Sequence, residues 1–126
     1  MIKPATYNMY LEIGRDFNQI FYLQDVNGSI IDLTGYTAKA QMRPSFNSDE
    51  LLVEFHTTVS GSAGTVELYL SDEETALLEI ENKINLSDTT TSENAVYDLM
   101  LTDTLGKKYN YVKGTITIEG TATRSS

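Results

Sequence analysis

The stretch Val96-Tyr97-Asp98-Leu99-Met100-Leu101-Thr102-Asp103 places apolar and polar residues on opposite faces of an extended chain. A second stretch, Asp32-Leu33-Thr34-Gly35-Tyr36-Thr37, opens another run of the same kind. Because successive side chains of a strand point to opposite faces, such alternation predicts a strand with one buried face. No convincing catalytic group lies in or around these stretches. Together they predict a small all-β protein that acts by binding rather than by chemistry.

The rest of the chain continues this pattern. Strands are expected over residues 6–13, 17–23, 36–43, 51–58, 65–70, 95–102 and 108–119, with a short extended piece over 30–33. Buried faces are expected to carry Tyr7, Met9, Leu11 and Ile13 in the first strand, Tyr36, Ala38, Ala40 and Met42 in the third, Leu51, Val53 and Phe55 in the fourth, and Val66, Leu68 and Leu70 in the fifth. Turns are expected at Asn27-Gly28, Gly61–Gly64 and Asp103–Lys107. Gly114 predicts a bulge or bend in the last strand.

One segment has a helical rather than a strand period. Ser71 precedes three acidic residues, and Glu74 stands three positions after it, which is the pattern of a capping box. The apolar residues Ala76, Leu77 and Ile80 recur at helical spacing, so a short helix is predicted over residues 72–80. Seven to eight short strands with one short helix predict an immunoglobulin-like β-sandwich in a single domain, residues 1–126. The Cys…Trp…Cys pattern of true immunoglobulin domains is absent.

Composition limits the possible partners. The 126 residues carry a net charge of −9 and contain no cysteine, so a disulfide framework and a thiolate metal site are excluded. From Glu67 to Asp103 there are ten acidic residues against one basic residue, Lys83. Such a chain is repelled by nucleic acids and by anionic membranes. The acidic stretch is either a solvated face or a docking surface for a basic partner. Neither a signal peptide nor an apolar run of membrane-spanning length is expected.

Each residue or motif that could form a catalytic, metal-binding or ligand-binding site also has a purely structural interpretation. His56 is the only histidine and lacks the companion groups that a metal site or a catalytic base requires. Residues 25–29 resemble the start of a calcium loop, but the twelfth position would be Tyr36 instead of an acid. Tyr109 and Tyr111 could stack on bases or sugars, or could simply cover a face of the sheet. We therefore expect no catalytic residue, no metal and no cofactor.

The order and spacing of several short motifs resemble a known family. The motifs are Gly14 with Phe17; Asp25 with Gly28; residues 32–43, which read DLTGYTAKAQMR; residues 64–71, GTVELYLS; residues 75–77, TAL; residues 96–99, VYDL; residues 114–118, GTITI; and residues 123–124, TR. This pattern is similar to the small β-sandwich proteins of tailed-phage tails and virions. It also resembles the amino-terminal domains of phage baseplate upper proteins and fibre-anchoring proteins.

The resemblance implies a non-enzymatic virion structural protein, assembled in the host cytoplasm. Its subunits would form a symmetric ring or repeated copies that join the particle or tail to fibre components. Its partners would be tail, baseplate, neck or fibre subunits, with no nucleic acid, membrane or cofactor. A capsid decoration or receptor-binding module that reads glycans through Tyr109 and Tyr111 is the first alternative, and a glycan hydrolase is the second. Partner contacts are expected at the two termini and at Asp72, Glu73, Glu79, Ser87, Asp88, Thr89, Thr90, Thr91, Ser92 and Glu93, the last seven in a polar loop predicted over residues 81–94.

Overall fold

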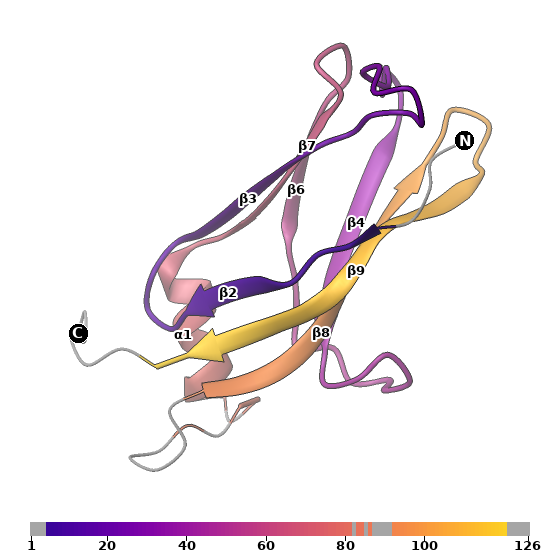
Figure 1. Cartoon of the computed structure of the whole chain (residues 1–126). Helices are drawn as coiled ribbons and strands as arrows, with labels where there is room; N and C mark the ends of the chain where they lie inside the picture. The colour runs from indigo at the N-terminus through magenta and orange to yellow at the C-terminus, as the bar shows by residue number, and fades with distance from the viewer. Residues whose placement is uncertain (1–4, 82, 85, 87–91, 121–126) are drawn as a thin grey trace.

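The computed structural model describes residues 5–81, 83–84, 86 and 92–120, which form two stacked sheets and one helix (Figure 1). The elements are β1 (Ala5–Thr6), β2 (Met9–Glu12), β3 (Phe17–Tyr22), β4 (Thr37–Arg43), β5 (Val53–Glu54), β6 (His56–Ser60), β7 (Thr65–Leu70), α1 (Asp72–Ile80), β8 (Ser92–Thr102) and β9 (Lys108–Glu119). The predicted turns at Gly61–Gly64 and Asp103–Lys107 are confirmed.

The larger sheet has the strand order β1-β9-β8-β4-β5, and β2 also pairs with β9. The smaller sheet has the order β3-β7-β6. β1 and β2 run parallel to β9 in one continuous register, whereas all the other neighbours are antiparallel. In the lettering of immunoglobulin domains, β3, β7 and β6 correspond to strands B, E and D, while β4, β8 and β9 correspond to C, F and G. The predicted immunoglobulin-like β-sandwich is confirmed.

Two pairs of short strands are pieces of longer ones. β1 and β2 follow each other along the same edge of β9. β5 and β6 are separated only by Phe55, whose N–H donates to the Ala40 carbonyl at 2.9 Å. The chain leaves the larger sheet there and enters the smaller one. When each pair is counted once, the described residues contain seven strands, within the predicted seven to eight.

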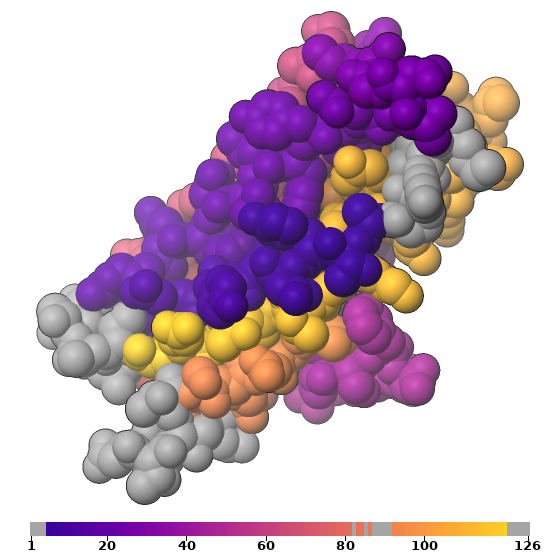
Figure 2. Space-filling view, in the orientation of Figure 1, coloured from indigo at the N-terminus to yellow at the C-terminus, as the bar shows by residue number. Residues whose placement is uncertain are grey.

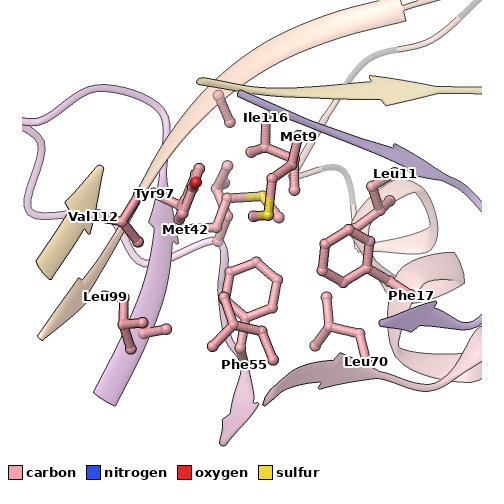
Figure 3. Close-up of a cluster of buried hydrophobic side chains, with 14 of the residues drawn as sticks. Met9, Leu11, Phe17, Met42, Phe55, Leu70, Tyr97, Leu99, Val112 and Ile116 are labelled. Carbon is pink, nitrogen blue, oxygen red and sulfur yellow. The ribbon is translucent and has the colours of Figure 1, made fainter. Parts of the chain in front are cut away.

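The core lies between the sheets and is almost wholly apolar (Figure 3). Ala40 and Met42 of β4 and the alternate residues of β7 are fully buried, as the alternation predicts. Figure 3 shows Met42, Tyr97 and Leu99 of the larger sheet facing the same interior as Phe17 and Leu70 of the smaller one. No buried side-chain polar atom of the described residues lacks a hydrogen-bond partner. This interior therefore has the properties of a structural core rather than of a reactive site.

The alternation predicted around residue 51 is wrong. Leu52, not Leu51, is buried, and its N–H donates to the Met42 carbonyl at 2.8 Å. Phe55 is buried as well, although a regular strand would turn Leu52 and Phe55 to opposite faces. Both can be buried because the chain changes sheets at Phe55. The alternation of buried and exposed side chains does not continue through a change from one sheet to the other.

Gly114 has a different role from the predicted one. The irregularity in the β8–β9 ladder lies three residues earlier: Leu99 pairs with Val112 and Met100 with Asn110, which leaves Tyr111 as the extra residue. A Cβ atom on Gly114 would lie 2.1 Å from the carbonyl oxygen of Tyr7. Gly114 therefore permits close approach of the first strand, which is also interrupted there, at residues 7–8.

The helix is confirmed with its predicted bounds and capping box. Its buried residues, however, are Thr75 and Leu78, while Leu77 and Ile80, which signalled the helix, are exposed. The Thr75 hydroxyl accepts a hydrogen bond from the Gly14 N–H at 3.0 Å and lies 2.9 Å from the Arg15 carbonyl. This contact with the β2–β3 turn, rather than the apolar pattern, sets which side of α1 faces inward.

The Asn27-Gly28 turn forms as predicted, but it does not start a new strand. Asp25 accepts from the Gly28 N–H through its backbone carbonyl and from the Asn27 and Ser29 N–H groups through its side chain. Gly28 has a φ of 82°, which a glycine adopts without strain. Beyond the turn, Gln24 and Ile30 form a single bridge, and the N–H groups of Ile31 and Leu33 donate to the Leu23 and Gly61 carbonyls. Residues 30–33 are therefore extended, as expected, without forming a regular strand.

Candidate interaction surface

The predicted acidic positions on α1 lie at the surface, near the β2–β3 turn. Asp72 and Glu73 are exposed in the first turn of the helix, and Glu79 is half-buried two turns later. The structure adds Asp16 to this group, because its carboxylate accepts from the Asp72 N–H at 2.7 Å. Acidic side chains near a helix N-terminus are stabilised by the helix dipole, which accounts for their placement without a partner. Their role in partner binding stays a prediction.

The predicted partner loop ends earlier than expected. Ser92 and Glu93 belong to β8 and pair with Glu119 and Ile118 of β9, so assigning them to the loop was wrong. The alternation of β8 begins there with polar residues, which is why the strand start was not evident from the sequence. Residues 87–91 (Ser87, Asp88, Thr89, Thr90 and Thr91) and the two termini, residues 1–4 and 121–126, lie outside the described residues.

His56 is an exposed strand residue. Its Nε2 atom lies 2.7 Å from Oε2 of Glu74, and 64% of its side chain is exposed. The hydrogen bond from the Ser71 backbone is the main cause that lowers the pKa of Glu74, and His56 adds to the effect. The described part of the chain holds no group of three or more His, Cys, Asp or Glu residues that could bind a metal ion. The contact between His56 and Glu74 links β6 to α1.

The two tyrosines considered for glycan binding bond to groups of the chain itself. The Tyr109 hydroxyl lies 3.3 Å from a carboxylate oxygen of Asp103, and the Lys107 ammonium group lies 5.5 Å from the Tyr109 ring. The Tyr111 hydroxyl donates to the Tyr22 carbonyl at 3.5 Å. Both side chains are half-buried. They therefore do not form the exposed aromatic pair that the glycan hypothesis requires.

The structure brings together a surface that the sequence analysis did not select. On the outer face of the smaller sheet, Ile20 is 39% exposed, Tyr22 70% and Tyr69 37%. Asn18 pairs with Tyr69 across β3 and β7, and Ile20 pairs with Glu67. We call Ile20, Tyr22 and Tyr69 the outer-face patch. The signal in the sequence is the alternation of these β3 residues with Phe17 and Phe21, whose burial leaves Ile20 and Tyr22 on the other face.

Acidic groups surround one end of the outer-face patch. Partial burial raises the pKa of the Tyr69 hydroxyl, and the nearby carboxylates of Asp16, Asp72, Glu74 and Glu67 raise it further. Glu67 also accepts a hydrogen bond from the Asn18 side-chain amide. The three residues of the patch carry no charge, but Glu67 lies directly opposite Ile20 across β3 and β7, so the patch is a small apolar area bordered by a carboxylate on a strongly acidic protein.

The free edge of β3 adjoins the outer-face patch. Residues of an antiparallel pair exchange backbone hydrogen bonds at every second position. The Leu23 N–H donates to the Gly64 carbonyl at 2.8 Å, which continues the β3–β7 register by one residue. The residues that bond to β7 are therefore Leu23 and every second residue before it. The residues between them are Asn18, Ile20 and Tyr22, and their backbone groups point away from β7. These groups form an edge that no strand of the described chain pairs with.

A groove follows this edge. It has a volume of about 450 Å³ and is lined by residues 7–12 and 15–19, which belong to β2, β3 and the segments next to them. The indigo and violet atoms of β2 and β3 lie on the surface of the face shown in Figure 2. Tyr7, which lines this groove, packs edge-to-face on Phe21 with ring centres 5.7 Å apart. This side of the sandwich offers backbone groups as well as side chains to a partner.

Comparisons with known proteins find similarity only at low sequence identity and low TM-score. No family model and no curated protein matches the chain. Among solved structures, one from a photo-crosslinking study of cell-adhesive interactions of VGSC β subunits is 13% identical, with 94% of this chain and 93% of that chain covered and a TM-score of 0.43. The second Ig domain of the mouse polymeric immunoglobulin receptor is 10% identical, with 95% and 100% covered and a TM-score of 0.43. With TM-scores below 0.5, neither similarity bears on the function of this chain. No helix in the described residues has the length and apolar character needed to cross a membrane.

Proposed function

We propose that this protein is a non-enzymatic structural subunit of a tailed-phage particle. It acts as an adaptor in the tail, baseplate or neck and joins the particle or tail to fibre components. The sandwich supplies a stiff block, and its exposed edge and outer-face patch supply the contacts. The protein is made in the cytoplasm of the bacterial host and ends in the virion as repeated copies.

The observation that carries this proposal is the uncharged edge of β3 together with the outer-face patch. On a protein with a net charge of −9, an exposed apolar area beside unpaired backbone groups is a surface suited to another protein. An assembly subunit needs such a surface, whereas an isolated protein gains nothing from exposing it. The acidic residues around the patch favour partners with basic groups at the rim.

The absence of a converging reactive site in the described residues also supports a structural role. The one close histidine–carboxylate pair, His56 with Glu74, is exposed and joins two structural elements. The core has satisfied polar groups and fully packed apolar side chains. The phage assignment comes from the motif order quoted above, because the fold by itself is shared by proteins of many functions.

Mass spectrometry of purified particles tests this proposal. Particles of the phage that carries the gene are washed at high salt, and their proteins are quantified relative to the major tail protein. The proposal expects the protein in intact particles at a fixed ratio, and it expects loss of tail or fibre attachment when the gene is deleted. A protein found only in the infected-cell lysate, never in washed particles, would refute it.

The glycan-binding alternative has less support. It would need exposed aromatic side chains free to stack on sugar rings, whereas Tyr109 and Tyr111 are half-buried and bonded to Asp103 and to the Tyr22 carbonyl. Binding of the isolated protein to host cells or to a glycan array would revive it.

A further inference from the structure

The smaller sheet lacks one strand of the immunoglobulin pattern. In immunoglobulin domains strand A belongs to the same sheet as strands B, E and D. Here the first strand, β1 with β2, pairs with β9 of the larger sheet instead. No other strand of the described residues lies on the outer side of β3, which corresponds to strand B. The place of strand A is therefore open to a partner.

β3 also lacks the features that normally prevent an edge strand from pairing. Natural edge strands are protected by a charged side chain, a proline, a bulge or a very short length. β3 has six residues, Phe17–Tyr22, with no charge, no proline and a regular register to β7. Among the other edges of the described chain, β5 has two residues, and β2 has four and includes Glu12. The last strand of the smaller sheet, β6, lies against β4, where the Thr57 hydroxyl donates to the Ala38 carbonyl at 3.0 Å.

The outward carbonyl groups of β3 have only weak local partners. The Gln19 side-chain amide donates to the Ile20 carbonyl at 3.1 Å, and the Tyr111 hydroxyl donates to the Tyr22 carbonyl at 3.5 Å. Both hydrogen bonds are exposed to solvent, where such bonds contribute little net stability. An incoming strand can replace them with backbone hydrogen bonds.

The groove runs along the first half of this edge. On β3 its lining extends from Phe17 to Gln19, and from the first strand it includes Tyr7. Its charged lining residues, two carboxylates and one guanidinium, all lie within residues 12–16, at or next to the β2–β3 turn. Beside β3 itself the groove therefore suits uncharged, apolar side chains.

Charge selects the kind of partner. β7 carries one acidic residue and α1 four, and β3, β6, β7 and α1 contain neither lysine nor arginine. The carboxylates of Asp16, Glu67, Asp72 and Glu74 lie close enough to Tyr69 to raise the pKa of its hydroxyl group. Because Asp16 directly precedes β3, these carboxylates gather at the same end of the strand as the groove. A segment bound there gains from lysine or arginine side chains on the outer face.

We propose that β3 binds an extended, basic segment of another protein, which adds antiparallel to β3 in the place of strand A. The side chains of this segment alternate: one set is apolar and enters the groove, and the other lies on the outer face and includes lysine or arginine. Asn18 and Ile20, whose backbone groups point outward, each exchange two hydrogen bonds with the residue opposite. The smaller sheet thereby gains a fourth strand.

Glu67 is placed to bind a basic side chain of the added segment. Its carboxylate accepts from the side-chain amide of Asn18, so it leans toward β3 on the outer face. Neighbouring strands lie about 4.8 Å apart, so a lysine or arginine opposite Asn18 can reach this carboxylate. A second copy of the chain gains nothing comparable, because its β3 has no positive charge and its net charge is also −9. The inference rests on the proposed function, since it specifies the segment by which the adaptor holds a neighbour.

NMR titration of the purified protein with a synthetic peptide tests the proposal. The probe has about nine residues, with valine at the even positions and lysine and threonine in turn at the odd ones, so that one face is apolar and the other basic. We expect a dissociation constant of about 10 µM to 1 mM, because the strand is short and the interface small. At saturation the amides of Asn18 and Ile20 should exchange at least about tenfold more slowly than in the free protein.

Two further peptides are controls. A peptide of the same composition without the alternation should bind at least about tenfold more weakly, and one with glutamate in place of lysine should not bind. Equal binding of the alternating and the reordered peptide, or binding that leaves Asn18 and Ile20 unprotected, would overturn the proposal.

The peptide-free protein tests the other possible occupants of the edge. Protection of Asn18 and Ile20 at every protein concentration would assign the edge to another segment of the same chain. Protection that rises with protein concentration would assign it to a second copy. Either result would overturn the proposal.

Ile20→Pro tests the backbone contacts. The Ile20 N–H does not bond to β7, so a proline there leaves the internal ladder intact and blocks an added strand. We expect a folded protein that binds the peptide at least about tenfold more weakly. Thr6→Pro is the matched control, because the Thr6 N–H points away from β9 and Thr6 does not line the groove. It should bind the peptide like wild type, and circular dichroism checks that both variants fold.

A second pair of variants covers the case in which either proline unfolds the chain. Glu67→Lys should weaken binding of the basic peptide at least about threefold. Glu50→Lys makes the same change of net charge at an exposed position before β5, at the opposite edge of the larger sheet from β2, and should change binding by less than about twofold. Equal effects of the two variants would contradict the proposed placement of the basic side chain.

The results separate this inference from the proposed function. A protein present in washed particles whose β3 does not bind the peptide would refute strand addition alone. A protein that binds the peptide but is absent from washed particles would refute the virion role alone.

Discussion

The hydroxyl group of Tyr97, in the middle of β8, donates a hydrogen bond to the backbone carbonyl of Tyr7, between β1 and β2. The two residues are 90 positions apart in the chain. Tyr97 is buried, and desolvation raises the pKa of its hydroxyl well above the ordinary value. The hydroxyl therefore stays protonated and continues to donate. This contact fastens the first strand to the larger sheet at the point where that strand is interrupted.

Replacing Tyr97 by Phe should destabilise the protein by about 1–3 kcal/mol, because the Tyr7 carbonyl loses its partner in a partly buried setting. Urea unfolding followed by circular dichroism measures the change. Tyr111→Phe is the control: its hydroxyl bond is long and exposed, so the loss should be smaller than for Tyr97→Phe. Equal losses in the two variants would contradict the assigned role of Tyr97.

Replacing Gly114 by Ala should cost about 3 kcal/mol, at the upper end of the range for over-packing. The new Cβ would meet the backbone oxygen of Tyr7 at 2.1 Å, and backbone cannot rotate away as a flexible side chain can. Gly28→Ala is the comparison. Gly28 has open space around it, so only the strain of its positive φ remains, about 1 kcal/mol. Thermal unfolding of the two variants should show this order, and the reverse order would refute the close-approach explanation.

Thr75→Val should lower the free energy of unfolding by about 1–3 kcal/mol. The side chain keeps its shape, but the Gly14 N–H loses its hydrogen-bond acceptor inside the contact between α1 and the β2–β3 turn. Hydrogen exchange at Gly14 should become faster. Thr115→Val, at an exposed position of β9, should change stability by less than about 0.5 kcal/mol. A neutral Thr75→Val would mean that α1 is held by its other contacts.

The pH dependence of stability should show a contribution from Glu74. Hydrogen bonds lower its pKa in the folded state, so the folded protein binds a proton there less readily than the unfolded chain does. The resulting stability is present above the ordinary value of 4.5 and is lost as the pH falls through the lower folded value. Glu74→Gln should therefore flatten the decline of the unfolding free energy below pH 4.5.

Glu73→Gln is the matched control for that measurement. It removes the same charge from the same turn of α1 but leaves the capping box and the contact with His56 in place. If both variants changed the acid slope equally, the effect would come from the net charge rather than from the hydrogen bonds of Glu74.

Most of the fold was predictable because it follows from local pattern. The alternation of apolar and polar residues in β4 and β7 predicted which face of each strand is buried, and the capping box predicted the start of α1 at Asp72. The errors occur where tertiary contacts override the pattern. The chain changes sheets at Phe55, Thr75 turns α1 toward the β2–β3 turn, and Tyr7 approaches Gly114. Each of these contacts joins segments distant in sequence, and periodicity carries no information about them.

The candidate surface was less predictable. The acidic residues of α1 could be placed because a helix start and a charge pattern are local signals. The free edge of β3 could not, because its sequence would suit a central strand equally well. Only the order β3-β7-β6 leaves one side of β3 without a neighbour. Ile20 and Tyr22 are candidate contact residues because of this strand order, not because of their residue types.

An averaged cryo-electron microscopy map of the intact particle tests the central claim most directly. The account predicts density for this sandwich, in repeated copies, at a junction of the tail, baseplate or neck with the particle or its fibres. A map in which the sandwich decorates the capsid lattice or sits at a fibre tip would contradict the adaptor role. A complete particle without the protein would contradict the structural role altogether.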